Sequence, residues 1–215
     1  ALARDIEETL GDVVVLGFPD TGGFFAVTNS ERPIAKLADF EGTNGKTPVG
    51  SLVQGSNGKL YGNTQYGGAT TNYGVVFSFD IATNTISKLK EYSNTVGLYP
   101  RSGFLLANNG KLYTATISGG GLNYGTIVEY DIASNTLTSK DDFNNTLIGA
   151  SAYSNLMQAS NGKIYGTAYQ GGANNKGTIY EFDISSGKLK GLAHFNGANG
   201  QGPRGTLTQA SNGKL

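Results

Sequence analysis

The sequence predicts an all-β fold made of a repeated unit of four short antiparallel strands. Three observations carry this prediction: a motif that returns at a fixed period, apolar residues that alternate between turn signals, and 33 glycines in 215 residues. Alternation with a period of two is typical of strands with one buried face, and Asn and Gly mark the tight turns between them. A repeat of about fifty residues matches the length of a propeller blade.

The tripeptide Asn-Gly-Lys sets the period of the repeat. It occurs four times, with separations of 52, 52 and 51 residues, beginning at Asn57, Asn109, Asn161 and Asn212. A Gly-Gly pair, a later single Gly and an aromatic residue followed by Asp keep the same spacing. Each unit closes on an aromatic residue: Phe40, Tyr92, Phe143 and Phe195.

The strands of one unit can be placed in order along the second copy. Residues 51–54 lead into an Asn-Gly turn and residues 59–65 return, because Asn-Gly between apolar runs is a strong hairpin signal. Residues 75–81 alternate in apolar character and reach a second turn, and residues 86–92 return from it. A four-stranded meander at this period predicts a β-propeller.

The sequence predicts one propeller domain over residues 1–215. The blade repeats are expected at approximately 41–92, 93–143 and 144–195. Residues 196–215 supply a first strand at 206–209 and the start of a second, and residues 1–40 supply the remaining strands of the same blade. We therefore expect a four-bladed ring closed by a blade shared between the two termini, which leaves no exposed sheet edge. The alternative is an open fragment of a larger propeller.

Composition argues against several classes of partner. Sixteen Lys and Arg balance sixteen Asp and Glu without a basic run, so we expect no nucleic-acid partner. The longest apolar run, residues 13–16 with Gly17 and Phe18 after it, is too short to cross a bilayer, and no membrane insertion is expected. No Cys and one His leave too few ligands for a zinc site, so we expect neither a metal nor another cofactor.

Several residues match patterns found in functional motifs, and each match has a simpler structural interpretation. His194 stands where the other copies carry acidic residues, so a solvated strand position is expected. Residues 200–205 match GxGxxG, but no helix follows that could bind a pyrophosphate. The aspartates that open the third-to-fourth turns are expected to cap those turns rather than to bind calcium: Asp80, Asp131 and Asp183.

Two stretches represent the repeat most fully, NGKLYGNTQYGGATTNYGVVFSFD from Asn57 and NGKIYGTAYQGGANNKGTIYEFD from Asn161. Over residues 34–215 the sequence resembles the GloVer tandem repeat of bacterial secreted or surface proteins of the choice-of-anchor kind. The resemblance implies an extracellular or cell-surface, propeller-like module that usually accompanies other domains or a sorting signal. Thr114 replaces an expected Gly, Ser151 replaces an expected Pro, and residues 1–33 diverge.

The loop-rich face is the expected binding surface. In a four-stranded meander, the second-to-third loops and the interblade connections share one face, and here they hold Tyr, Asn and basic residues that suit sugars or peptides. The candidate ligand-binding residues are Asn72, Tyr73, Tyr99, Arg101, Asn123, Tyr124, Tyr153, Asn175, Lys176 and Arg204. The alternative is that the Asn residues only shape turns and that Tyr73 and Tyr124 only cover blade edges.

The sequence favours a non-enzymatic binding or adhesion module, secreted or held at the cell surface, that recognises polysaccharide or protein. The paired carboxylates, at 7–8 and 141–142, are adjacent in sequence and point to opposite faces of a strand, so no acid–base couple is expected. Two alternatives stay open. One is a structural or filament-forming subunit that acts by self-association, and the other is a hydrolase or lyase with carboxylates in a central channel.

Overall fold

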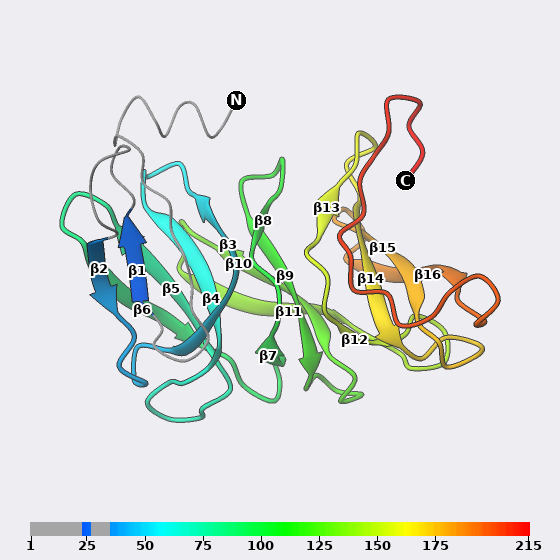
Figure 1. Ribbon diagram of the computed structural model, residues 1–215, viewed down its shortest axis with the longest axis horizontal. Coiled ribbons are helices and arrows are strands. Elements are labelled where there is room, and N and C mark those ends of the chain that lie inside the picture. The colour runs from blue at the N-terminus through cyan, green and yellow to red at the C-terminus, as the bar shows by residue number, and fades with distance from the viewer. Residues whose placement is uncertain (1–22, 27–34) are drawn as a thin grey trace.

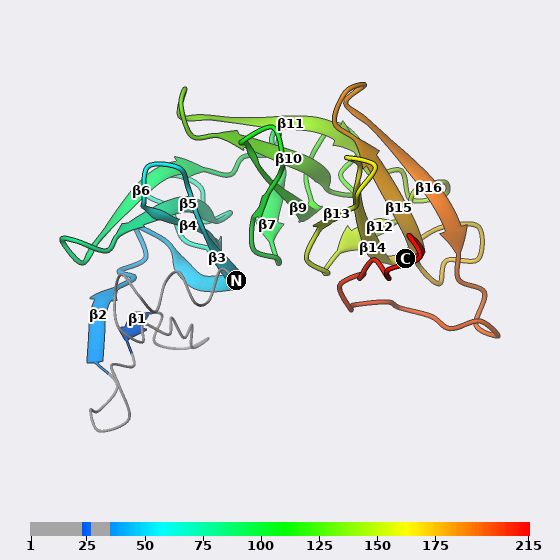
Figure 2. The same cartoon turned by 90° about the horizontal axis from the view of Figure 1, so that it is seen from above.

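The structure, a computed structural model, describes residues 23–26 and 35–215. Three blades stand side by side in Figure 1, and Figure 2 shows that they form an arc with the innermost strands on its concave side. The predicted all-β fold of four-stranded antiparallel blades is confirmed. Within the described residues, no helix is long and apolar enough to span a membrane.

The strands follow one another across each blade in chain order. Blade 1 consists of β3 (Lys46–Gln54), β4 (Leu60–Tyr66), β5 (Val75–Asp80) and β6 (Thr85–Glu91). Blade 2 consists of β7 (Leu98–Pro100), β8 (Leu105–Leu106), β9 (Leu112–Ser118), β10 (Thr126–Asp131) and β11 (Thr136–Asp142). Blade 3 consists of β12 (Ala150–Ala152), β13 (Met157–Gln158), β14 (Ile164–Gln170), β15 (Thr178–Asp183) and β16 (Lys188–His194). A separate antiparallel pair precedes them, β1 (Gly23–Ala26) and β2 (Ala35–Asp39).

The innermost strand is irregular in every blade. In blades 2 and 3 it is divided into two short strands that both pair with the second strand, β7 and β8 with β9, and β12 and β13 with β14. In blade 1 the single strand β3 shifts its register between Val49 and Val53. The sequence predicted only the second half of this strand.

A kink with positive φ precedes each irregularity. The φ angles are 58°, 56° and 57° at the equivalent residues Thr47, Tyr99 and Ser151, and 58° at Gly202. Positive φ is uncommon for residues other than Gly, so its return at one repeat position identifies a built-in feature of the blade.

The kinked residue forms a hydrogen bond to the preceding blade. Its N–H donates to a carbonyl in the second-to-third loop of that blade, with distances of 3.1, 3.5 and 2.8 Å for Tyr99 to Tyr73, Ser151 to Tyr124 and Gly202 to Lys176. A second interblade hydrogen bond lies at the other end of the inner strand, where Gln158 Oε1 accepts from the N–H of Asn108 at 2.8 Å. In blade 3 the inner strand is therefore bonded to blade 2 at both ends.

The hydrophobic core lies largely between adjacent blades. One cluster joins Tyr61, Val76 and Tyr92 of the blade 1 region to Leu112 and Tyr130 of blade 2. A second joins blades 2 and 3 and includes Tyr113, Ile127, Phe143, Tyr180 and Phe182. The aromatic residues that close the second and third units, Tyr92 and Phe143, are fully buried, so each unit ends in the contact with its neighbours.

Backbones of adjacent blades also approach closely. A Cβ at Gly103 would collide with the backbone carbonyl oxygen of Ser51, on the inner strand of blade 1. Only Gly fits at such an approach. This contact lies in the segment between β7 and β8, which explains why the inner strand of blade 2 leaves its ladder there.

The strand predicted at 206–209 is not formed. Residues 201–209 nevertheless occupy the position of an inner strand on blade 3, because Gly202 donates to Lys176 and Gln209 Oε1 accepts from the N–H of Ser160 at 2.9 Å. A ladder needs a second strand beside it, and among the described residues none lies there. The following Asn-Gly-Lys turn is formed, with a 2.7 Å hydrogen bond from Ala210 N–H to the Lys214 carbonyl.

The predicted closure of a four-bladed ring depends on residues that are only partly described. In the described part, β1 pairs with β2, and no ladder joins either strand to residues 196–215. The β1–β2 pair and the C-terminal segment lie at opposite ends of the arc in Figure 2. Leu215, whose side chain a closed blade would bury against the N-terminal strands, is 47% exposed. Residues 12–18, which would supply a further strand of the shared blade, lie outside the described residues, and closure stays a prediction.

Replacing Phe143 by Ala should destabilise the protein strongly. Phe143 is fully buried and meets Tyr180 edge to face, with ring centroids 4.9 Å apart. Removing a buried Phe ring costs about 3–5 kcal/mol in unfolding free energy. Urea denaturation followed by circular dichroism measures this loss. The control, Leu192→Ala, changes a residue that is 43% exposed and should shift stability little; equal effects of both changes would contradict the buried position of Phe143.

Replacing Tyr180 by Phe should raise the unfolding free energy. The Tyr180 hydroxyl is buried and has no hydrogen-bond partner among the described residues. A buried, unsatisfied polar group costs about 1–3 kcal/mol, and Phe keeps the ring contact while removing the hydroxyl. A higher denaturation midpoint with an unchanged slope is the expected result. A lower midpoint would show that the hydroxyl is satisfied in solution.

Candidate ligand-binding site

The candidate site is built on one repeat position, two residues after the kink of each inner strand. This position holds Val49, Arg101, Tyr153 and Arg204. The Cζ atom of Arg101 lies 5.3 Å from the ring centroid of Tyr153, and that of Arg204 lies 5.0 Å from the same centroid. Three of the predicted residues, from successive repeats, are therefore in direct contact.

Tyr169, in β14, completes this group. Arg204 Cζ lies 4.5 Å from the Tyr169 ring centroid, and the rings of Tyr153 and Tyr169 meet edge to face at 5.4 Å and 87°. Each contact between a guanidinium and a ring contributes about 0.5–2 kcal/mol, so the four side chains hold one another in place. We call Arg101, Tyr153, Tyr169 and Arg204 the Arg–Tyr strip.

Gln65 holds Arg101 as Tyr169 holds Arg204. With its amide oxygen turned toward Arg101, Gln65 accepts hydrogen bonds of 2.8 Å from both Nε and Nη2. Gln65 and Tyr169 occupy the same repeat position, two residues before the Gly-Gly pair. Sequence reasoning missed both residues, although their fixed spacing from the Gly-Gly pair was visible.

Tyr99, another predicted residue, belongs to a separate aromatic group. Its ring centroid lies 5.5 Å from that of Tyr66 and 5.6 Å from that of Tyr73. Tyr73 is half-buried and packs against the core between blades 1 and 2. These rings cover the blade edge on the loop-rich side, beside the inner strand that carries Arg101.

An open groove adjoins the strip at blade 3. It has a volume of about 480 Å³ and is lined by Tyr169, Gln170, Asn175, Lys176, Gln201, Gly202 and Arg204. The lining combines an aromatic ring with amide, ammonium and guanidinium groups. Such a surface can stack on an apolar face and donate several hydrogen bonds at once.

The three predicted Asn residues shape the second-to-third loops. Asn72, Asn123 and Asn175 have φ angles of 54°, 59° and 52°. Their Oδ1 atoms accept the N–H of Gly67, Gly119 and Gly171 at 2.9, 3.1 and 3.0 Å. These bonds hold each Asn amide against its own loop, which is a turn-shaping role.

Tyr124 lies apart from the strip. It is 41% exposed, and its ring forms no aromatic or cation–π contact with a described residue. At the equivalent position, the Lys176 side chain is exposed at the edge of the groove. The ten predicted residues therefore divide into the strip, the Tyr99 group, the groove edge, the turn-shaping Asn residues and the isolated Tyr124.

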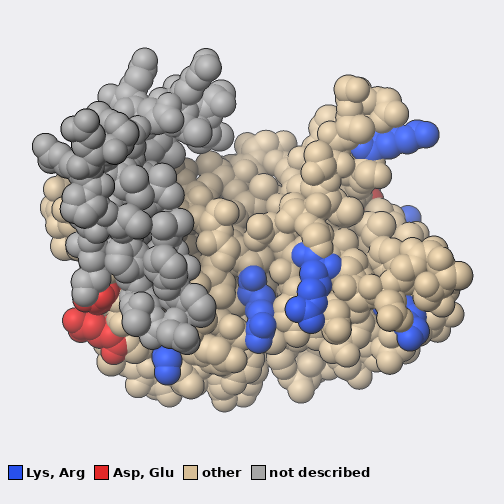
Figure 3. All heavy atoms as spheres, in the orientation of Figure 1, with Lys and Arg blue, Asp and Glu red and all other residues tan. Residues whose placement is uncertain are grey.

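Basic side chains are spread over the concave face of the arc. Figure 3 views this face and shows separate Lys and Arg side chains along it, with visible acidic groups almost confined to one edge. Neither Arg101 nor Arg204 forms an ion pair with a carboxylate among the described residues. Arg204 also forms no hydrogen bond through its guanidinium within this part of the chain.

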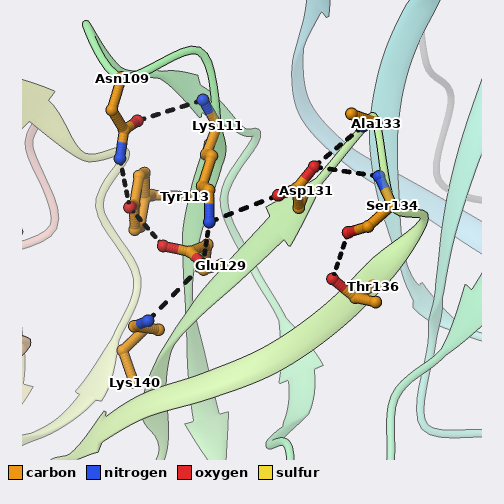
Figure 4. Close-up of polar contacts among 9 residues, drawn as sticks. All are labelled: Asn109, Lys111, Tyr113, Glu129, Asp131, Ala133, Ser134, Thr136 and Lys140. Atoms are coloured by element: carbon orange, nitrogen blue, oxygen red, sulfur yellow. Dashed lines mark hydrogen bonds and ion pairs between the residues drawn. The ribbon is translucent and has the colours of Figure 1, made fainter.

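The most concentrated charged cluster belongs to the scaffold. In Figure 4, Glu129 accepts a 2.5 Å hydrogen bond from the Tyr113 hydroxyl and pairs with Lys111 and Lys140 at 3.0 and 3.6 Å. Burial alone would raise the pKa of Glu129, but the hydrogen bonds from Tyr113 and Lys111 outweigh it and hold that pKa below its ordinary value. An ionised, fully bonded carboxylate of this kind is a poor acid or base.

Asp131, in the same cluster, confirms the predicted turn-capping role. Its Oδ1 accepts the N–H of Ala133 at 2.9 Å and of Ser134 at 3.2 Å. Asp80 and Asp183 make the same bonds in blades 1 and 3. Within the described residues, no group of three or more His, Cys, Asp or Glu could hold a metal ion.

The fourth strand of each blade anchors the second-to-third loop. Glu91 accepts the N–H of Ala69 at 2.8 Å and of Thr70 at 3.1 Å, and Asp142 accepts from Gly121 at 2.8 Å. His194 Nδ1 accepts the N–H of Ala173 at 3.2 Å. His194 ends β16 and is half-buried, in agreement with the expected polar strand position, and its cross-loop hydrogen bond is a structural use that the sequence did not show.

Fold and site together define a β-propeller-like repeat module with an aromatic and basic concave face. The family model described as the Gloeobacter/Verrucomicrobia repeat matches residues 14–121 and 97–215. The chain belongs to this repeat family, in agreement with the predicted GloVer resemblance. A search of the curated proteins finds no match.

Solved structures of low sequence identity share the fold. The extracellular domain of a putative hybrid two-component system from B. thetaiotaomicron is 14% identical, with a TM-score of 0.62, over 94% of this chain and 24% of that one. A putative TolB from Agrobacterium tumefaciens is 12% identical, with a TM-score of 0.53, over 90% and 63%. A putative gluconolactonase is 16% identical, with a TM-score of 0.53, over 88% and 60%. The chain thus spans between 24% and 63% of the length of these three proteins, which are β-propeller-like.

Replacing Glu91 by Gln should change how stability depends on pH. Burial alone would raise the pKa of Glu91, but bonds from Lys88, Ala69 and Thr70 outweigh it and lower that pKa from 4.5 to about 2. A depressed carboxyl pKa stabilises the folded state above the ordinary pKa, and this contribution is lost as the pH falls from 4.5 toward 2. The Gln variant should be less stable than the parent at pH 7, and the difference should shrink across this window.

Urea denaturation at several pH values checks this prediction. Glu41→Gln is the control, since Glu41 is exposed and its side chain forms no ion pair within the described residues. The unfolding free energy of Glu41→Gln should match that of the parent protein at each pH. A difference between parent and Glu91→Gln that stays constant down to pH 2 would contradict the role of the Glu91 charge.

Proposed function

We propose that this chain is a secreted, non-enzymatic module that binds polysaccharide through the Arg–Tyr strip and the adjoining groove. The observation that carries the proposal is the direct contact of Arg101, Tyr153, Tyr169 and Arg204 on the concave face. Flat rings can stack on the apolar faces of sugar rings, while guanidinium and amide groups donate hydrogen bonds to their oxygens.

The scaffold supports a recognition role for this face. The inner segments that carry Tyr153 and Arg204 are hydrogen-bonded to the preceding blade at the kink and near the far end, and the inner strand that carries Arg101 is bonded at its kink. Side chains on a rigid element lose little conformational freedom on binding, which favours affinity. A protein ligand remains compatible with the same rings, and the binding experiment below distinguishes it.

An extracellular location is part of the proposal. The repeat family resembles modules of secreted and surface proteins, and one structure with the same fold is an extracellular domain. A protein outside the cell can be stable without disulfides, and here the core between the blades buries large aromatic residues.

The chemistry of the groove supports binding rather than catalysis. None of its lining residues is a carboxylate or an imidazole, the groups that most often serve as acid, base or nucleophile in glycan-cleaving enzymes. One fold relative carries the name putative gluconolactonase, so hydrolysis of lactones or glycans is the competing activity to assay.

Replacing Tyr153 and Tyr169 together by Ala should weaken glycan binding. Truncating aromatic anchors that a ligand covers typically costs about 2 kcal/mol or more, so affinity should fall at least about tenfold. The parent protein is first screened on an array of neutral and acidic glycans, and the variant is then compared by isothermal titration calorimetry on a glycan that binds. Thermal melting of each variant confirms that it is folded.

The control is Tyr124→Ala, which removes an exposed ring outside the strip. Its affinity should match that of the parent protein. A loss of affinity in Tyr124→Ala without a loss in the double variant would show that the ligand binds at the second-to-third loop that holds Tyr124 and not at the strip. Binding of a protein but of no glycan, or turnover of a glycan or lactone, would overturn the proposed function.

A further inference from the structure

We propose that the ligand is an acidic polysaccharide whose carboxylate or sulfate groups bind Arg101 and Arg204, both of which lie against the Tyr153 ring. This inference rests on the proposed function and specifies the chemical class of its ligand. It follows from the state of the two guanidinium groups, from the composition of the groove and from the repeat position that the strip residues share.

The arginines of the strip have no carboxylate partner among the described residues, whereas six of the twelve lysines of the chain have one. Ion pairs with Asp or Glu occupy Lys59, Lys88, Lys111, Lys140, Lys163 and Lys188. Neither Arg101 nor Arg204 has such a pair within the described residues. Their charges are therefore available to a ligand, whereas the charges of the scaffold lysines are already compensated.

The geometry of Arg204 favours a planar or multi-oxygen anion. Its guanidinium lies 5.0 Å from the ring centroid of Tyr153 and 4.5 Å from that of Tyr169, and its N–H groups donate to no described residue. Rings that hold a guanidinium in this way preorganise its donor fork, which matches carboxylate and sulfate oxygens in pairs. Arg101 is similarly positioned by the Gln65 amide and the Tyr153 ring.

The groove provides a positive environment on a chain without net charge. Lys176 and Arg204 line it together with uncharged residues. The chain as a whole carries equal numbers of basic and acidic residues. A local positive potential without a global one attracts an acidic ligand to this face and not to the molecule as a whole.

The shared repeat position favours a polymer over a single sugar. Arg101, Tyr153 and Arg204 stand at equivalent positions, so charge, ring and charge follow one another from blade to blade. A chain of acidic sugars presents rings and charges in the same alternating way. One short oligosaccharide is long enough to contact both arginines, because both lie against the same ring.

The test compares Arg101→Gln/Arg204→Gln with the charge-matched control Lys90→Gln/Lys190→Gln. Lys90 and Lys190 lie on the outermost strands β6 and β16, and their side chains form no ion pair within the described residues. The probes are galacturonate oligomers, dextran sulfate, uncharged dextran and poly-L-glutamate. Calorimetry at low and high salt gives the affinity of each pair of protein and probe.

We expect the parent protein to bind galacturonate oligomers or dextran sulfate at least about tenfold more tightly than dextran. High salt should weaken this binding, because it screens charge. The arginine variant should lose at least about tenfold in affinity for the acidic glycan, and the lysine variant should stay within about twofold of the parent. Arg204→Lys, which keeps the charge but loses the planar fork, should lose a part of the affinity. Preference for galacturonate identifies carboxylates as the bound groups, and preference for dextran sulfate identifies sulfates.

Three results would overturn the inference. Equal binding of dextran and the acidic glycans, with the arginine variant unchanged, would refute the acidic ligand while leaving the proposed glycan binding intact. Equal losses in the arginine and lysine variants would show an effect of overall charge. If poly-L-glutamate binds as tightly as the acidic glycans, the site recognises negative charge and does not require a sugar. The absence of binding to any glycan would instead refute the proposed function itself.

Discussion

The arrangement of the blades depends on one repeated hydrogen bond, from a kinked residue of each inner strand to a loop carbonyl of the preceding blade. Tyr99, Ser151 and Gly202 make this bond with the same positive φ. The apolar faces of one blade cannot be buried by that blade alone, so aromatic residues from neighbouring blades must meet. The kink fixes where the aromatic residues of neighbouring blades meet. It also determines which residue of the inner strand faces the next blade.

The two ends of each blade use polar groups in opposite ways. At the short-turn end, Lys111, Tyr113, Glu129 and Asp131 satisfy one another, and the equivalent residues of blade 3 repeat most of this network. Such a closed network stabilises the blade and offers little to a ligand. At the loop-rich end, the guanidinium of Arg204 is held by rings and keeps its donors free among the described residues. Recognition can therefore be confined to one end while the other maintains the fold.

The sequence predicted features that arise within one repeat and missed those that arise between repeats. The Asn-Gly turns and the capping by Asp131 follow from local patterns and were correct. The divided inner strand was missed because the approach of Gly103 to Ser51 involves residues 52 positions apart. The partnership of Tyr169 with Arg204 was missed for the same reason. The prediction of a strand at 206–209 was wrong, because a strand pattern without a neighbouring strand forms no ladder.

The position two residues after each kink has a consequence for how such a protein can diversify. Val, Arg, Tyr and Arg occupy it in the four copies, while the backbone around it is set by the kink and, in the last three copies, by the interblade hydrogen bond. A single codon change there alters the chemistry of the concave face without altering the fold, since the backbone bonds do not involve that side chain. Duplication of a repeat adds one more such position. The module therefore has a combinatorial surface, in which the order of the copies specifies the order of the contacts.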